Sequence, residues 1–260
     1  MENFRAGKEL LTMRRRTMLV LLVLALLSSI VMAQTSTSLT NLDAGFQALL
    51  FHAARLDESY PEAFRRYTPI AMAIDAFGKA VKEEDQAGEA SLMLGLIYTY
   101  LERPGTALDY YLRFAELNPE DAWVHALIGD RYAEMGRLNE AEQSYRLALA
   151  GAPDEGSWAR AHYGLGAVAL ERGQYSQAKE SFELALEQAE DFFDARLGLG
   201  QALYHLGEYE QAIEVLEVAH LQWPRSLTML QYLGWSYEAA GLSDQAAHAF
   251  DRLAELGGGN

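Results

Sequence analysis

The stretch Ile128–Pro153, IGDRYAEMGRLNEAEQSYRLALAGAP, decides the fold because its small and aromatic residues recur along the chain. In this copy they are Gly129, Tyr132, Gly136, Ala141, Tyr145, Ala148 and Pro153. Other copies carry Gly95, Tyr98, Ala107, Tyr111 and Pro119; Gly166, Gly173, Ala178, Phe182 and Ala185; Gly200, Gly207, Ala212, Ala219 and Pro224; and Gly234, Tyr237, Gly241, Ala246 and Phe250. The step from Gly200 to Gly234 is repeated between other copies, and a fixed period of this length indicates a repeat architecture.

Each copy reads as two helices separated by a turn. Apolar residues at helical spacing mark one side of each helix, namely Leu127, Ile128, Tyr132 and Met135 in the first and Ala141, Tyr145, Ala148 and Leu149 in the second. Gly136 stands where the first helix should stop, in a position that favours a left-handed backbone. Gly129 and Ala141 let the two helices approach closely, and Tyr145 fills the space beside them. One such pair cannot bury its apolar face alone, so we expect the copies to stack.

In these residues the chain resembles the tetratricopeptide repeat, a helix-turn-helix unit of about 34 residues. The resemblance runs from Gly88 to near Leu256, and the predicted units are 88–121, 122–158, 159–192, 193–226 and 227–256. It implies an all-α fold, an α-solenoid in which about five to six helix pairs coil into a right-handed superhelix. The chain departs from the family at His125 and His162, where Trp is frequent, and an insertion near Pro153–Trp158 lengthens one step of the repeat.

The N-terminal segment predicts export. Arg14, Arg15 and Arg16 precede an apolar run, and Val31-Met32-Ala33 offers a cleavage site before Gln34. This order is typical of a secretory signal peptide over residues 1–33. An uncleaved anchor formed by residues 17–33 is the alternative, since about 17 apolar residues lie near the lower limit for a membrane span. Either segment places the remainder outside the cytoplasm, as a periplasmic or secreted protein or one anchored to the inner membrane. Whether translation starts at Met1 or Met13 stays open.

The segments that flank the repeats are expected to differ from them. Residues 34–40 are rich in Ser and Thr and predict a linker, and residues 41–87 predict a degenerate N-terminal repeat that serves as a cap. Thr68-Pro69 is a helix-start signal. Residues 257–260 predict a Gly-rich tail. The last repeat must then end the stack with a polar face made by Asp244, Gln245, His248 and Arg252, or be covered by a partner or a second copy.

Composition excludes several function classes. The formal net charge of −16 disfavours nucleic-acid binding, which needs clustered Lys and Arg, and confines membrane contact to an uncleaved N-terminal segment. The chain has no cysteine, and no nucleophile, phosphate-loop or paired-histidine motif is present. We therefore expect no catalytic residues, no metal and no cofactor.

The resemblance also predicts a surface for function. In this family the first helices of stacked pairs form a concave wall that commonly binds peptides or extended segments of partner proteins. Side chains expected to point into it are Leu92, Leu96, Trp123, Asp130, Arg160, Tyr163, Gln201, Tyr204 and Trp235. Trp, Tyr and Arg dominate binding hot spots. The expected function is a non-enzymatic interaction scaffold outside the cytoplasm, in cell-envelope assembly or secretion. The alternative is a structural module of the envelope that self-associates through its C-terminal repeat.

Overall fold

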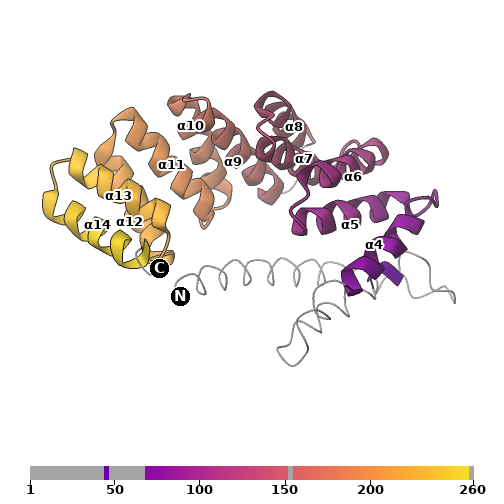
Figure 1. Ribbon diagram of the computed structural model, residues 1–260. Coiled ribbons are helices and arrows are strands. Elements are labelled where there is room, and N and C mark those ends of the chain that lie inside the picture. The colour runs from indigo at the N-terminus through magenta and orange to yellow at the C-terminus, as the bar shows by residue number, and fades with distance from the viewer. Residues whose placement is uncertain (1–43, 47–67, 152–154, 258–260) are drawn as a thin grey trace. The chain divides into compact units, whose positions relative to one another are not determined.

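The computed structural model describes residues 44–46, 68–151 and 155–257 (Figure 1). The predicted signal segment and the linker lie outside these residues, as does most of 41–67. The helices between Thr68 and Gly257 are α4 (Thr68–Ala80), α5 (Ala87–Tyr100), α6 (Pro104–Leu117), α7 (Ala122–Glu134), α8 (Leu138–Ala150), α9 (Glu155–Glu171), α10 (Tyr175–Gln188), α11 (Phe193–Leu206), α12 (Tyr209–Gln222), α13 (Leu227–Ala239) and α14 (Ser243–Gly257). None of them is long and apolar enough to cross a bilayer. The predicted all-α fold of stacked helix pairs is confirmed.

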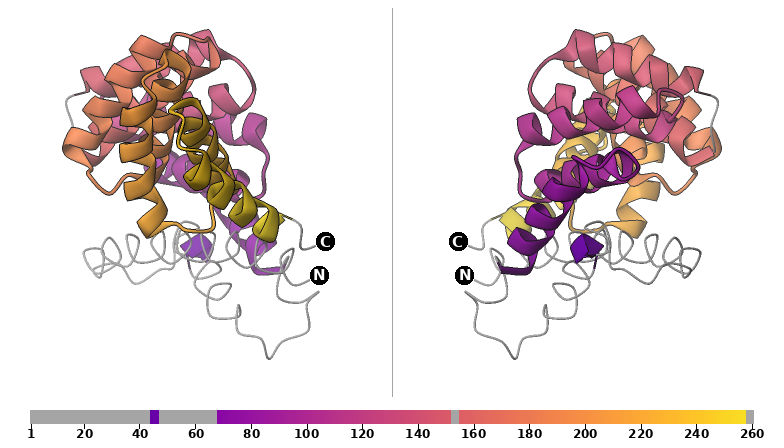
Figure 2. Two further views of the ribbon diagram at one scale, coloured as in Figure 1. Left: turned by 90° about the vertical axis from the view of Figure 1, so that its left-hand side faces the viewer. Right: turned by 90° about the vertical axis from the view of Figure 1, so that its right-hand side faces the viewer.

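The chain divides into two compact units, which are described separately. The described part of the first contains α4, α5 and α6, and that of the second contains α7 to α14. In the second unit every helix packs on the next, and the first helices of successive pairs also contact one another, α7 with α9, α9 with α11 and α11 with α13. No second helix of residues 121–257 contacts another to this degree. The first helices therefore form a continuous row, called here the first-helix wall; Figure 2 shows the stack from two sides.

An aromatic ring held between glycines fixes the spacing of this row. Phe182 of α10 is 1% exposed and lies against Gly166 of α9 and Gly198 of α11. A Cβ atom at either glycine would come within 3.0 Å of the ring, a separation that real Cβ atoms do not show. Tyr145 of α8 lies in the same way against Gly129 and Gly164. Each second helix is thus joined to its own first helix and to that of the next pair.

The α11/α12 pair departs from this arrangement. Leu216 of α12 occupies the position of the ring and lies against Gly200 of α11. The next glycine of the series is replaced, because Tyr232 stands one repeat period after Gly198. Tyr232 packs against the core cluster that contains Leu216 and remains only half-buried. On α12, Leu216 is smaller than the aromatic residue that it replaces, and on α13, Tyr232 is larger than the glycine that it replaces. The Tyr232 ring lies on the wall side.

The first helices end in left-handed turns. Gly136, Gly173, Gly207 and Gly241 have φ of 71°, 71°, 79° and 78°. The next amide reaches back across each turn, as when the Arg137 N–H donates to the Tyr132 carbonyl at 2.8 Å. Such a bond satisfies a carbonyl that the helix end would leave unpaired. The turn after α5 has the same geometry with Glu102 in place of glycine, at φ 57°.

Two predicted boundaries need correction. Helix α9 begins at Glu155, so the last residues of the predicted unit 122–158 belong to the third pair. The inserted residues extend this helix at its N-terminus, where the Trp158 ring lies 3.9 Å from that of His162 between centroids. This contact supplies the bulk that the family usually places at the histidine's position. Helix α14 includes Gly257, which was predicted to begin the tail.

The last helix carries the four polar side chains that were expected to end the stack. Asp244, Gln245, His248 and Arg252 of α14 are all exposed, whereas Ala246 and Ala249 are buried. The same four polar side chains line a hollow together with Glu217 and Leu221 of α12, so they face the preceding second helix.

We predict that Gly198→Ala lowers the free energy of unfolding by about 1–3 kcal/mol, because its methyl group overlaps the Phe182 ring. In a Phe182→Leu background, which reproduces the Leu216 arrangement, the same substitution should cost much less. Urea denaturation of the four proteins of this cycle gives the coupling. Gly78→Ala is the control, since nothing lies within 4 Å of its added Cβ. If Gly198→Ala lowers the free energy of unfolding equally in both backgrounds, the Phe182 ring is not what excludes a side chain at Gly198.

Glu102→Gly is expected to raise the free energy of unfolding by about 1 kcal/mol, because a left-handed backbone strains a residue with a Cβ atom. Glu102→Ala removes the carboxylate but retains the Cβ, so it separates the backbone effect from the side chain. Denaturation followed by circular dichroism should show a gain for glycine only. Identical gains for both variants would rule out backbone strain as the cause.

Candidate functional site

The structure places seven of the nine predicted binding residues on the first-helix wall of the α7–α14 unit. They are Trp123 and Asp130 on α7, Arg160 and Tyr163 on α9, Gln201 and Tyr204 on α11, and Trp235 on α13. Leu92 and Leu96 lie on α5, in the other unit. Leu96 is only 6% exposed, so its predicted place on an open surface is corrected. Its helical offset matches the wall, but the side chain is taken up by packing.

A hollow near the start of the wall is lined by two of these residues. Trp123, Gly156, Ser157, Arg160 and Phe192 line it, and it is called here the Trp123 hollow. Trp123 is 39% exposed, which is high for so large an apolar side chain. Phe192, just before α11, places its ring 4.9 Å from that of Tyr163. The hollow is therefore lined by two aromatic rings, a glycine and a serine, together with one cation.

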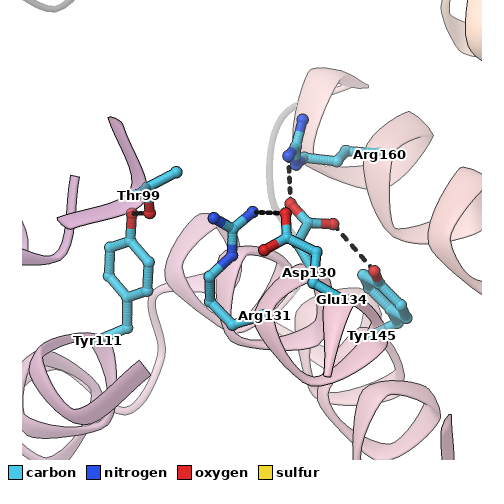
Figure 3. A network of polar contacts seen from close by, with 7 residues as sticks. All are labelled: Thr99, Tyr111, Asp130, Arg131, Glu134, Tyr145 and Arg160. Carbon is cyan, nitrogen blue, oxygen red and sulfur yellow. Dashed lines mark hydrogen bonds and ion pairs between the residues drawn. The ribbon is translucent and has the colours of Figure 1, made fainter. Parts of the chain in front are cut away.

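A network of partly buried polar side chains holds that cation. The Tyr145 hydroxyl donates to Oδ1 of Asp130 at 2.9 Å, and the Arg160 guanidinium pairs with Oδ2 of the same carboxylate (Figure 3). Burial raises the pKa of Tyr145 and the Asp130 carboxylate raises it further, so the phenol stays protonated and keeps donating. Because Asp130 already balances Arg160, this arginine is a weak candidate for clamping a partner's carboxylate.

Figure 3 also draws two other polar pairs, each of which lies within a single unit. Arg131 reaches Glu134 at 2.8 Å on the same helix. In the first unit the buried Tyr111 hydroxyl meets the Thr99 hydroxyl at 2.9 Å. Tyr111 and Tyr145 hold equivalent positions in successive repeats, so the two repeats satisfy the same buried phenol with different partners.

A second cluster of rings gathers further along the wall, across α10 to α13. It contains Tyr175, Tyr204, His205, Tyr209, Tyr232 and Trp235, and is called here the Tyr204 cluster. Tyr204 stacks on Trp235 with centroids 5.8 Å apart. Tyr232 meets both rings edge-on, at 5.6 Å from Tyr204 and 5.1 Å from Trp235. These separations are those of favourable aromatic pairs.

His205 joins the cluster to the neighbouring second helix. Its ring stacks on Tyr175 with centroids 4.5 Å apart, and its Nε2 lies 3.4 Å from the Tyr232 hydroxyl. Burial raises the pKa of Tyr232, and the nearby Tyr204 and Tyr175 raise it further. The Tyr232 phenol is therefore neutral at physiological pH and supplies both a ring face and a hydroxyl donor. Gln201, half-buried one turn before Tyr204, adds an amide to the same helix face.

Four members of the Tyr204 cluster were missed in the sequence: Tyr175, His205, Tyr209 and Tyr232. One signal was present for Tyr232, which stands where the series places a glycine. The other three lie at or next to the turns between helices, outside the offsets used to define the wall. Their convergence depends on how α10 and α12 pack, and this packing is not visible in the period.

The site supplies contact surfaces and hydrogen-bonding groups. No set of three or more His, Asp or Glu residues within the described ranges is arranged to hold a metal ion. The wall presents two separated aromatic features on one row of helices, and this spacing suits an elongated ligand that runs along the row.

Comparison with known proteins identifies the repeats. Family models described as tetratricopeptide repeat match residues 70–122 and 93–156, 169–225, and 229–256. The chain is 30% identical over 173 residues to the peroxisomal targeting signal receptor of Kluyveromyces lactis. That match covers 61% of this chain and spans only 30% of the receptor's length.

Solved structures share the fold. One is YrrB, described as a tetratricopeptide repeat protein with an unusual peptide-binding site, with a TM-score of 0.57 and 21% identity over 70% of this chain and 93% of YrrB. Another is MamA from Desulfovibrio magneticus RS-1, with a TM-score of 0.57 and 24% identity over 65% of this chain and 94% of that one. The repeat matches cover residues 70–156, 169–225 and 229–256, and these ranges take in most of the helices from α4 to α14, with the gap at 157–168 falling inside α9. The chain belongs to the tetratricopeptide repeat family.

Proposed function

We propose that the first-helix wall binds an extended segment of a partner protein, and that the chain acts as a non-enzymatic interaction scaffold. Tetratricopeptide repeat proteins mediate protein–protein interaction. The observation that carries the proposal is the placement of the Trp123 hollow and the Tyr204 cluster on one row of helices. Two anchoring points on one wall match a ligand that is longer than a single side chain.

The chemistry of the wall supports this assignment. Trp and Tyr bury much apolar area while losing few rotamers, so they carry a large share of binding energy where they are exposed. Trp123 meets this condition directly. The comparisons add support, since YrrB is described by its peptide-binding site and the Kluyveromyces lactis relative is named as a receptor for a targeting signal.

We place this activity outside the cytoplasm, in cell-envelope assembly or secretion. Support comes from the arginines at 14–16, the apolar run after them and the cleavage site ending at Ala33. Cell fractionation combined with N-terminal sequencing of the product tests this placement. A mature chain that begins at Gln34 agrees with a cleaved signal. A full-length chain in the cytoplasmic fraction contradicts export.

The full chain can be used to select binding peptides from a random displayed library. The affinity of these peptides should depend on the side chains of the first-helix wall. We expect Trp123→Ala and Trp235→Ala each to weaken the selected peptides about 10-fold, since losing a hot spot costs more than about 1 kcal/mol. Calorimetry measures the affinities, and circular dichroism checks that helical content is unchanged. Leu221→Ala is the matched control, because Leu221 is 83% exposed on the second helix α12.

The opposite pattern would contradict the proposal. Peptides that lose affinity with Leu221→Ala and keep it with both tryptophan variants do not use the wall. If, in addition, the full chain is a dimer by light scattering, self-association through the last repeat replaces the peptide-binding assignment.

A further inference from the structure

We propose that the Tyr204 cluster is a subsite for a cationic side chain, so that the partner segment carries Arg or Lys where it crosses α11 and α13. This inference rests on the proposed function and specifies the chemistry of its ligand. It concerns one part of the wall. Failure of the cationic subsite and failure of the proposed function give different results in the experiment.

Ring geometry gives the first reason. Tyr204 and Trp235 stack at 5.8 Å with an angle of 29° between their planes, and Tyr232 stands edge-on to both. All three side chains are half-buried, so part of each ring is open to a ligand while the rest is held by packing. The faces of Trp and Tyr rings attract a cation that comes within about 6 Å of the ring centroid.

Local charge gives the second reason. Glu238 is exposed on α13 and lies three residues after Trp235, which puts it on the same helix face. Residues 193–257 contain nine carboxylates, three arginines and no lysine. A cation that approaches the rings therefore enters a region of negative potential, where the field of the surrounding protein favours it.

The cations carried by α10 to α14 and their turns do not lie over the cluster, which gives the third reason. Arg196 donates to the Glu190 carbonyl, and Arg252 pairs with Glu255 at 2.8 Å. Arg225 lies in the turn between α12 and α13, and Lys179 of α10 pairs with Glu208 at 2.6 Å. In the part of the chain that the structure describes, no cation lies over Tyr204, Tyr232 or Trp235.

A contact between a cation and an aromatic ring is already formed within an earlier repeat. The guanidinium carbon of Arg137 lies 4.5 Å from the centroid of the Tyr132 ring. The Trp123 hollow likewise contains its own cation, Arg160. Of these aromatic sites the Tyr204 cluster is the one with a neighbouring carboxylate and no cation in place, so a preference for a cation should be confined to it.

The test compares short peptides with blocked termini that differ only in carrying arginine or citrulline at the same positions. Citrulline keeps the planar shape of arginine and removes its charge. With the full chain at physiological ionic strength, calorimetry should show about 5- to 10-fold tighter binding of the arginine peptide. Trp235→Leu and Tyr204→Leu should bring this ratio close to one, and Glu238→Gln should reduce it by about half.

Two controls separate the subsite from general charge attraction. Glu214→Gln removes one exposed carboxylate from α12, away from the first-helix wall, and should leave the ratio unchanged. Trp123→Leu should weaken both peptides equally, because its hollow does not select for charge. Circular dichroism confirms that each variant is folded.

The outcomes are distinct. If the ratio in the parent is one, or stays high in Trp235→Leu, the cationic subsite is overturned. If the wall variants weaken both peptides equally, the cationic subsite fails and the proposed function stands. If no wall variant changes the binding of either peptide, the proposed function fails and the subsite fails with it.

Discussion

The structure depends on the fit of one aromatic ring between two glycines. Phe182 and Tyr145 each touch a glycine of their own first helix and a glycine of the next. The ring supplies buried apolar area, and the absence of Cβ atoms lets two helix backbones come close enough to enclose it. Their repetition sets the spacing of α7, α9 and α11, and this spacing brings residues from different repeats together on one wall.

The place where the fit changes coincides with the densest group of wall aromatics. With Leu216 in the core position, the chain has room for Tyr232 where a glycine would otherwise lie. The extra ring lies beside Tyr204 and Trp235 and not in the core. The replacement of a glycine by Tyr232 thus adds a half-buried aromatic ring to the wall. In the α7–α9 region the packing rule is kept, and the wall there is shaped by a partly buried charge network around Asp130.

Much of the fold could be predicted from the sequence, and less of the site. The period, the paired helices and the left-handed glycine after the first helices α7, α9, α11 and α13 follow from residue type and spacing, and Gly136 and Gly207 have the expected backbone. The start of α9 at Glu155 did not follow, because an insertion can extend a helix or a loop. Helical offset placed Trp235 on the wall but could not show that Leu96 is buried. Nor could it bring Tyr175 and His205 together, since their contact depends on packing between two helices.

Nuclear Overhauser measurements on the Phe182 ring test the central claim most directly. The account predicts cross-peaks from the ring protons to the α-protons of both Gly166 and Gly198, with slow exchange of the amides in α9, α10 and α11. Cross-peaks to only one of these glycines, or fast exchange of the amides in α9, α10 and α11, would contradict it.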